Sequence, residues 1–126
     1  MIQTGLTYRD RLKFVIPDCV VLEANDGQAG LDLYKSRRID CLVTEHVLPD
    51  MSGIEILLEV VPHANRPQVP VVILSRATTR GLADIAKTNG AQAFLVKRLT
   101  SGDELATFIQ TAIAVVGPTI KDQPLT

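Results

Sequence analysis

Four short apolar runs, separated by segments with helical periodicity, most constrain the fold of this 126-residue chain. The runs cover residues 20–22, 39–44, 70–74 and 93–96, and they have the length and the β-branched content of buried strands. Between them, apolar residues recur at intervals of three and four, which predicts amphipathic helices. Because continuous apolar strands that alternate with helices form parallel sheets covered on both faces, the chain is predicted to be a three-layered α/β protein.

The helical patterns lie before, between and after these runs. Helices are expected over residues 8–16, 29–34, 54–61, 79–88 and 101–116. Gly90 is expected to end the fourth helix in the left-handed conformation. Residues 1–6 are a poor strand, with Gly5 and little β-branching, so the chain is predicted to start with a helix. We expect one domain over residues 1–117 and a loose tail over residues 118–126.

Composition and charge exclude several classes of protein. The formal net charge is −1 with both signs interspersed, which argues against a nucleic-acid or membrane-surface binder. No apolar run approaches the roughly 18 residues of a membrane-spanning helix, and the first residues lack the apolar stretch of a signal peptide. A cytoplasmic location is therefore expected. Cys19 and Cys41 are expected to be free thiols in strands, and the isolated His46 and His63 do not predict a zinc site.

Three polar residues directly follow predicted strands. Glu45 ends the second run, Ser75 follows the third, and Lys97 follows the fourth. The carboxyl ends of parallel strands meet at one edge of a sheet, which is where α/β folds keep their sites. The sequence therefore predicts that these three side chains converge.

Four motifs place these residues in a recognisable order. They are VxEAxDGxxGL at residues 21–31, ExxLPDMSG at 45–53, PVVILS at 70–75 and GAQAFLVK at 90–97. Over residues 8–116 the pattern resembles the receiver domain of two-component response regulators. The resemblance implies a flavodoxin-like fold that accepts a phosphoryl group on an aspartate after the third strand. It also implies Mg²⁺ held by an acidic pair after the first strand, in line with the preference of this ion for carboxylates.

The resemblance matches individual residues of this chain to functional positions of the family. Ser75 and Lys97 match the residues that contact the phosphoryl oxygens, and Phe94 matches the aromatic position whose rotamer follows phosphorylation. Arg76 stands where a small residue is usual. Arg98 stands where a proline is usual, so no cis peptide is expected there.

Two departures bear on the chemistry. Glu45 replaces the phosphorylated aspartate, and its carboxylate reaches about 1.5 Å further. A misplacement of about 1 Å can cost about 10²-fold in rate. Counting back from Asp26 and Gly27 puts Met1 where the acidic pair should be. The first strand and the acidic pair are therefore predicted to be missing, and Mg²⁺ binding is expected to be lost with them.

A missing first strand leaves three outcomes open. The second and third strands pair directly, which would bring Cys19 and Cys41 onto neighbouring strands. A partner chain donates or exchanges an element, giving a dimer. The third outcome is that the chain is truncated at its N-terminus.

The roles of the individual residues also stay open at this point. Glu45 is either a fixed anion that substitutes for the charged acceptor or a structural ion pair with Lys97. Ser75 is a strand-end hydrogen-bond donor or a vestige of the phosphoryl pocket. Phe94 is a core residue or a switch. Arg76 and Arg98 are solvated charges or part of the face that receivers use for partners.

The functional hypothesis is a degenerate receiver that acts through protein–protein contacts without phosphorylation. We expect no enzymatic activity, no metal, no nucleic acid and no membrane. The expected partner is a protein such as a histidine kinase or an output protein, and a homodimer is left open. The resemblance places the partner surface on the fourth helix, fifth strand and fifth helix.

Two alternatives belong to other classes. One is a competent phosphorelay receiver of a response regulator or hybrid histidine kinase, truncated at its N-terminus. The other is an unrelated flavodoxin-like enzyme or cofactor binder, which needs a phosphate-cradling glycine-rich loop after the first strand. Gly27 and Gly30 follow a different strand and do not match that loop.

Overall fold

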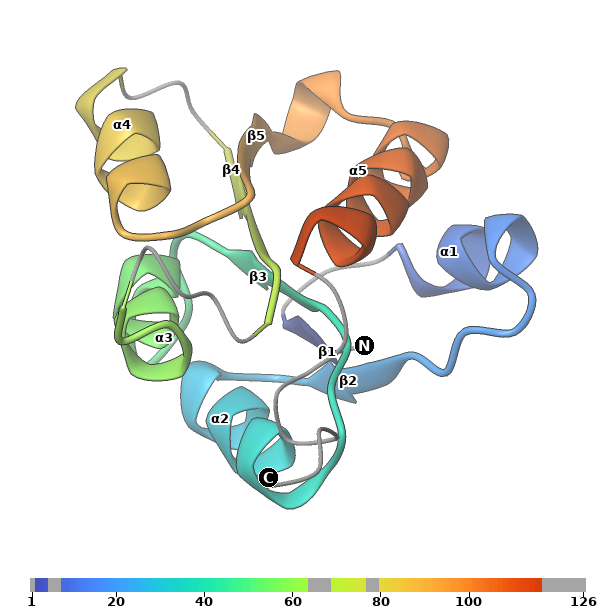
Figure 1. Ribbon diagram of the computed structural model, residues 1–126, viewed down its shortest axis with the longest axis horizontal. Helices are drawn as coiled ribbons and strands as arrows, with labels where there is room; N and C mark the ends of the chain where they lie inside the picture. The colour runs from blue at the N-terminus through green and yellow to red at the C-terminus, as the bar shows by residue number, and fades with distance from the viewer. Residues whose placement is uncertain (1, 5–7, 64–68, 77–79, 117–126) are drawn as a thin grey trace.

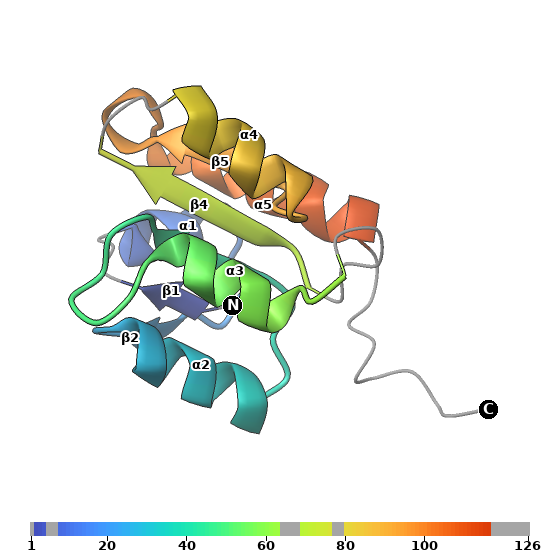
Figure 2. The same cartoon turned by 90° about the vertical axis from the view of Figure 1, so that its left-hand side faces the viewer.

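The fold is built on one parallel β-sheet. The computed structural model describes residues 2–4, 8–63, 69–76 and 80–116. Within these residues the sheet has five strands in the order β2-β1-β3-β4-β5, and all neighbouring pairs are parallel. The strands are β1 (Ile2–Thr4), β2 (Leu22–Ala24), β3 (Leu42–Glu45), β4 (Val71–Ser75) and β5 (Ala93–Val96). Their carboxyl ends therefore share one edge, as predicted (Figure 2).

Helices cover both faces of this sheet. They are α1 (Arg9–Val15), α2 (Gly27–Ser36), α3 (Gly53–Val60), α4 (Arg80–Thr88) and α5 (Gly102–Val116), with a short 3₁₀ helix η1 (Lys97–Leu99) after β5. Figure 1 shows α2, α3 and α4 on one face and α1 and α5 on the other. Each face has its own apolar core, centred on residues such as Ile56 and Ile73 on the first face and Leu12 and Leu105 on the second. The three-layered α/β prediction is confirmed.

The prediction that the first strand is missing is wrong. Residues Ile2–Thr4 form β1, which lies inside the sheet and pairs with β2 on one side and β3 on the other. The count back from Asp26 failed because it assumed more residues between the first and second strands than the chain has. The helix between them, α1, has only seven residues and ends before Pro17. Since β1 separates β2 from β3, those strands do not pair directly, and the chain itself fills the position that a partner would have supplied in one of the outcomes left open.

Two strand boundaries also differ from the prediction. The strand expected over residues 20–22 is observed as β2 at Leu22–Ala24, because its register is set by pairing with β1. Val20 lies outside it and is 69 % exposed. The strand expected from residue 39 begins at Leu42. Gly90 has φ 101°, so the predicted left-handed end of the fourth helix is confirmed.

Both cysteines are free thiols, as expected, but neither lies inside a strand. Cys41 is fully buried beside β3, and burial raises the pKa of its thiol to about 12. Cys19 is half-buried in the connection before β2. The predicted tail at residues 118–126 lies outside the described residues, and the domain boundary at residue 117 stays a prediction.

Gly53 allows α3 to start close against the end of β3. Its N–H donates to the carbonyl oxygen of His46 at 2.8 Å. A Cβ at this position would lie 2.6 Å from the carbonyl oxygen of Glu45. That oxygen belongs to the strand backbone, so it cannot move aside without displacing β3. The close approach therefore requires glycine and fixes where Glu45 emerges from the sheet.

We predict that Gly53→Ala lowers the free energy of unfolding by about 1–3 kcal/mol, because the added methyl overpacks the end of β3. Urea denaturation measures this change. Gly81→Ala is the matched control, since Gly81 lies in α4 and a Cβ there would meet nothing within 4 Å. The control is expected to be neutral or to stabilise by up to about 1 kcal/mol. Equal effects of the two alanines would contradict the steric argument.

Candidate functional site

An ion pair joins the ends of two strands at the carboxyl edge of the sheet. Glu45 is the last residue of β3, and Lys97 directly follows β5. The Lys97 Nζ atom lies 2.6 Å from Glu45 Oε1 and donates a hydrogen bond to it. The glutamate side chain is 14 % exposed and the lysine side chain 28 %. The predicted convergence of these two residues is thus confirmed.

Both side chains of this ion pair are largely shielded from water, so each charge is stabilised mainly by the other. Removing charged groups from water is costly, and a direct contact between opposite charges offsets that cost. If one partner is lost, the other is left as an uncompensated, largely buried charge. The pair therefore holds β3 and β5 together across β4, which lies between them.

Ser75 ends β4 at the same edge, and Arg76 directly follows it. Ser75 is 6 % exposed, and Arg76 is exposed. Both line a cavity of about 650 Å³ together with Glu45 and His46. The remaining lining residues of this cavity are Val47, Leu48, Pro49, Leu74 and Leu82. The structure therefore brings Ser75 close to the position of Glu45, as the strand order predicted.

Phe94 packs against His46, the residue directly after Glu45. The two rings meet edge to face, with centroids 6.1 Å apart and an interplanar angle of 60°. Phe94 is half-buried against the core under α2, α3 and α4, while the Nδ1 atom of His46 is buried and lacks a hydrogen-bond partner among the described residues. Phe94 thus belongs to the core, and its role as a switch stays a prediction. Arg98 is exposed in η1, and its peptide bond to Lys97 is trans.

The donor set at this edge does not fit a magnesium ion. Residues 5–8, which connect β1 to α1, are Gly, Leu, Thr and Tyr and contain no carboxylate. Glu45 already binds Lys97. Across the residues that the structure describes, no group of three or more His, Cys, Asp or Glu side chains could hold a metal. Mg²⁺ prefers carboxylates in near-octahedral geometry, which these residues do not supply.

Asp50 connects the loop after Glu45 to a different helix. Its carboxylate accepts hydrogen bonds from the backbone N–H groups of Gly27 at 2.8 Å and Gln28 at 2.9 Å. These two bonds lower the pKa of Asp50. Asp26 caps the same helix by accepting from the N–H of Ala29 at 2.8 Å. No local feature of the sequence indicated this contact, because both partners of Asp50 lie more than 20 residues away along the chain.

Tyr8 holds the segment that carries Lys97. Its hydroxyl donates to the carbonyl oxygen of Thr100 at 3.0 Å and lies 3.3 Å from that of Lys97. The neighbouring Arg11 forms two hydrogen bonds, of 2.6 and 2.9 Å, to the carboxylate of Asp103 at the start of α5. The sequence pattern predicted only a helix over residues 8–16 and did not indicate these bonds.

Comparison with known proteins identifies the family. The sequence model for the response regulator receiver domain matches residues 7–110. The chain belongs to this receiver family. It is 31 % identical over 85 residues to the two-component response regulator-like protein APRR7 of Arabidopsis thaliana, covering 66 % of this chain and 12 % of that protein. It is also 31 % identical over 84 residues to the transcriptional regulatory protein PdtaR of Mycobacterium tuberculosis, covering 67 % of this chain and 40 % of that protein. The receiver chain thus spans less than half the length of either relative.

Solved receiver structures share the fold. A response regulator receiver domain from Clostridium thermocellum superposes with a TM-score of 0.75 at 25 % identity, covering 90 % of this chain and 93 % of that one. The chemotaxis response regulator CheY4 of Vibrio cholerae superposes with a TM-score of 0.70 at 22 % identity, covering 88 % and 96 %. The flavodoxin-like receiver fold expected from the sequence is confirmed. No helix in the described part of this receiver combines the length and apolar character needed to traverse a bilayer.

We predict that Lys97→Met lowers the free energy of unfolding by about 1–3 kcal/mol, because it leaves the Glu45 carboxylate largely buried and unpaired. The double variant Lys97→Met/Glu45→Gln is expected to recover part of that loss. Chemical denaturation of both single variants and the double variant gives the coupling energy. Arg9→Met is the control, since the Arg9–Glu23 pair is exposed and changes stability by no more than about 0.5 kcal/mol. Purely additive effects at Glu45 and Lys97 would contradict the role of the pair.

The lowered pKa of Asp50 predicts how its contribution to stability depends on pH. Its pKa in the folded protein is below the ordinary value of 3.8, so its stabilising contribution is present above that value and is lost as the pH falls through the folded pKa. Asp50→Asn is therefore expected to lower the melting temperature at pH 7, with the difference from wild type shrinking below about pH 3.8. Asp84→Asn, at an exposed position of α4, is the control. A difference that stays constant between pH 7 and pH 3 would contradict the capping role.

Proposed function

We propose that this receiver is a pseudo-receiver, a signalling module that acts through protein–protein contacts without being phosphorylated. The observation that carries the proposal is the direct 2.6 Å contact between Lys97 Nζ and Glu45 Oε1. In this family the residue at the position of Glu45 accepts the phosphoryl group, and the lysine contacts the incoming oxygens. Here each of the two groups already binds the other.

The chemistry of phosphoryl transfer supports the proposal. A phosphoryl group brings nearly two negative charges, which a metal ion and a positioned cation must offset. The chain lacks the acidic pair that would hold the metal, and Lys97 is engaged with Glu45. Glu45 is also one methylene longer than the aspartate of the family, which displaces the accepting oxygen. All three departures act against transfer.

The proposed signal is a fixed conformation. A carboxylate carries about one negative charge, so its pair with Lys97 imitates a phosphorylated site only in part. The contact ties β3 to β5 permanently, and Phe94 lies in the core beside His46. In this proposal the receiver presents one surface to its partner at all times, and cellular control acts on the amount or the location of the protein.

The proposed partner surface lies on α4, β5 and α5. It carries exposed apolar residues: Ile85 on α4 is 49 % exposed, Leu99 on η1 between β5 and α5 is 67 % exposed, and Phe108 on α5 is 41 % exposed. Arg98 adds an exposed positive charge beside them, and Arg76 adds one at the end of β4. We propose a protein partner such as a histidine kinase or an output protein, no enzymatic activity, and a cytoplasmic location on the sequence argument alone.

We predict that millimolar Mg²⁺ followed by beryllofluoride leaves the amide NMR spectrum unchanged at Glu45, Ser75 and Lys97. Beryllofluoride imitates a phosphoryl group on a receiver carboxylate, and this site offers it neither a free carboxylate nor a metal. The measurement is an amide correlation spectrum of the labelled full chain. A receiver that has the aspartate and the acidic pair is titrated in parallel as a positive control.

The same titration tests the alternative of a competent phosphorelay receiver, which the retained Ser75 and Lys97 favour. Saturable shifts clustered around Glu45 would show a working pocket and overturn the pseudo-receiver proposal. The variant Glu45→Asp separates the two departures. If it restores beryllofluoride binding, the longer side chain alone blocks the site. If it does not, the missing acidic pair is sufficient to prevent beryllofluoride binding.

A further inference from the structure

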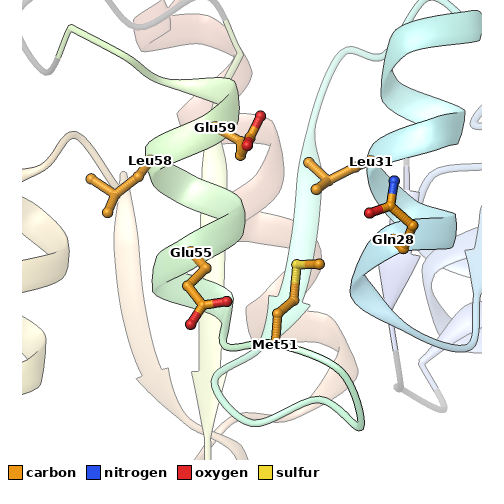
Figure 3. A pocket seen from close by; sticks show the side chains of 6 residues that line it. All are labelled: Gln28, Leu31, Met51, Glu55, Leu58 and Glu59. Atoms are coloured by element: carbon orange, nitrogen blue, oxygen red, sulfur yellow. The ribbon is translucent and has the colours of Figure 1, made fainter.

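A second depression lies between α2 and α3, with lining residues distinct from those of the cavity at Glu45. This α2–α3 groove measures about 600 Å³, within the range of clefts that hold ligands or several side chains. It is lined by Gln28, Leu31, Met51, Glu55, Leu58 and Glu59. Figure 3 shows Leu31 and Met51 reaching into the space between the two helices, with Glu59 on the same side of α3, while Leu58 projects from the side of α3 that faces away from α2.

The floor of the groove is apolar and adaptable. Leu31 is 5 % exposed, and Met51 is half-buried beside it. Gly27 makes room for Met51, because a Cβ at Gly27 would collide with the Met51 side chain. Methionine is flexible and polarisable, so it fits apolar surfaces of different shape. The floor can therefore receive apolar side chains from outside.

The rim of the groove is acidic. Glu55 and Glu59 are exposed and lie one turn apart on α3. On the opposite rim, the Gln28 side chain donates to the Asp32 carboxylate at 2.9 Å. Among the residues that the structure describes, no basic side chain pairs with Glu55 or Glu59, and Lys35 of α2 lies beyond the lining. This patch is thus more negative than the chain as a whole, whose net charge is −1.

The shape of the groove favours an elongated partner over a small molecule. Its rim residues are exposed along α3, so a small ligand would stay largely in contact with water. Leu58 is 51 % exposed at this rim and gains from being covered by another apolar surface. A segment that crosses over α3 would cover Leu58 on one side of this helix and meet Leu31 and Met51 on the other, which a small molecule between the helices cannot do.

We propose that the α2–α3 groove docks an amphipathic helix of a partner protein, with an apolar stripe of leucine or methionine flanked by lysines or arginines four residues apart. Glu55 and Glu59 are about 6 Å apart along the axis of α3, and two basic residues with the same spacing on a partner helix match them. The apolar stripe fills the groove and the basic flanks meet the acidic rim, as in other helix-in-groove complexes. The inference does not rest on the proposed function, since the groove shares no lining residue with the cavity at Glu45.

The test uses the labelled full chain and a synthetic helical peptide of about 15 residues, with leucines on one face and lysines beside them. Amide shifts are expected at Gln28, Leu31, Met51, Glu55, Leu58 and Glu59, with saturation that weakens as salt is added. A peptide with glutamates in place of the lysines is expected to give none. Shifts spread over the whole surface, or centred on α4 and α5, would overturn the proposal.

Matched variants locate the binding. Leu58→Ala is expected to weaken the peptide by about tenfold, whereas Ile85→Ala, which removes a side chain of similar exposure on α4, leaves it unchanged. Glu55→Lys/Glu59→Lys is expected to abolish binding at low salt, and Asp84→Lys on α4 is the charge control. Equal weakening by the groove variants and their controls would show non-specific attraction and overturn the proposal. Sedimentation of the free chain as a dimer that Leu58→Ala dissociates would assign the groove to a second copy and overturn it as well.

Discussion

The contact between Glu45 and Lys97 is the interaction on which the rest of the site depends. It links two strands that are not neighbours. Both side chains are largely buried, and each charge serves as the counter-ion of the other. Two contacts around it keep the two ends in place. Gly53 lets α3 start against the end of β3, and Tyr8 holds the backbone beyond Lys97. Each charge of this centre is therefore met by a residue of the chain itself.

The sequence was sufficient for most of the architecture and for the convergence of the site, but not for the first strand, β1. Four strands were predictable because their apolar runs are continuous, and the edge shared by Glu45, Ser75 and Lys97 followed from parallel topology. β1 was missed because its three residues carry no apolar pattern of their own and are held by backbone bonds to β2 and β3. The bonds of Asp50 to α2 and of Tyr8 to Thr100 were also unpredictable, because each joins residues far apart in the chain.

The loop after β3 relates the two surfaces of this receiver. His46 and Leu48 line the cavity at Glu45, Asp50 caps α2, and Met51 forms part of the floor of the α2–α3 groove. One short segment therefore contributes to the charged centre, to a helix cap and to an apolar surface. Its ends are fixed by the hydrogen bonds from His46 to Leu74 and from Gly53 to His46.

The burial of Cys41 has a practical consequence for following the motions of this protein. Alkylating reagents attack the thiolate, and Cys41 is both inaccessible and, with its pKa raised to about 12, protonated in the folded state. Its modification therefore requires the sheet to open around β3, whereas the half-buried Cys19 is reached by smaller local openings near β2. The alkylation rate of Cys41 thus reports on global opening and that of Cys19 on local opening. The two rates can be compared in the same sample without an added label.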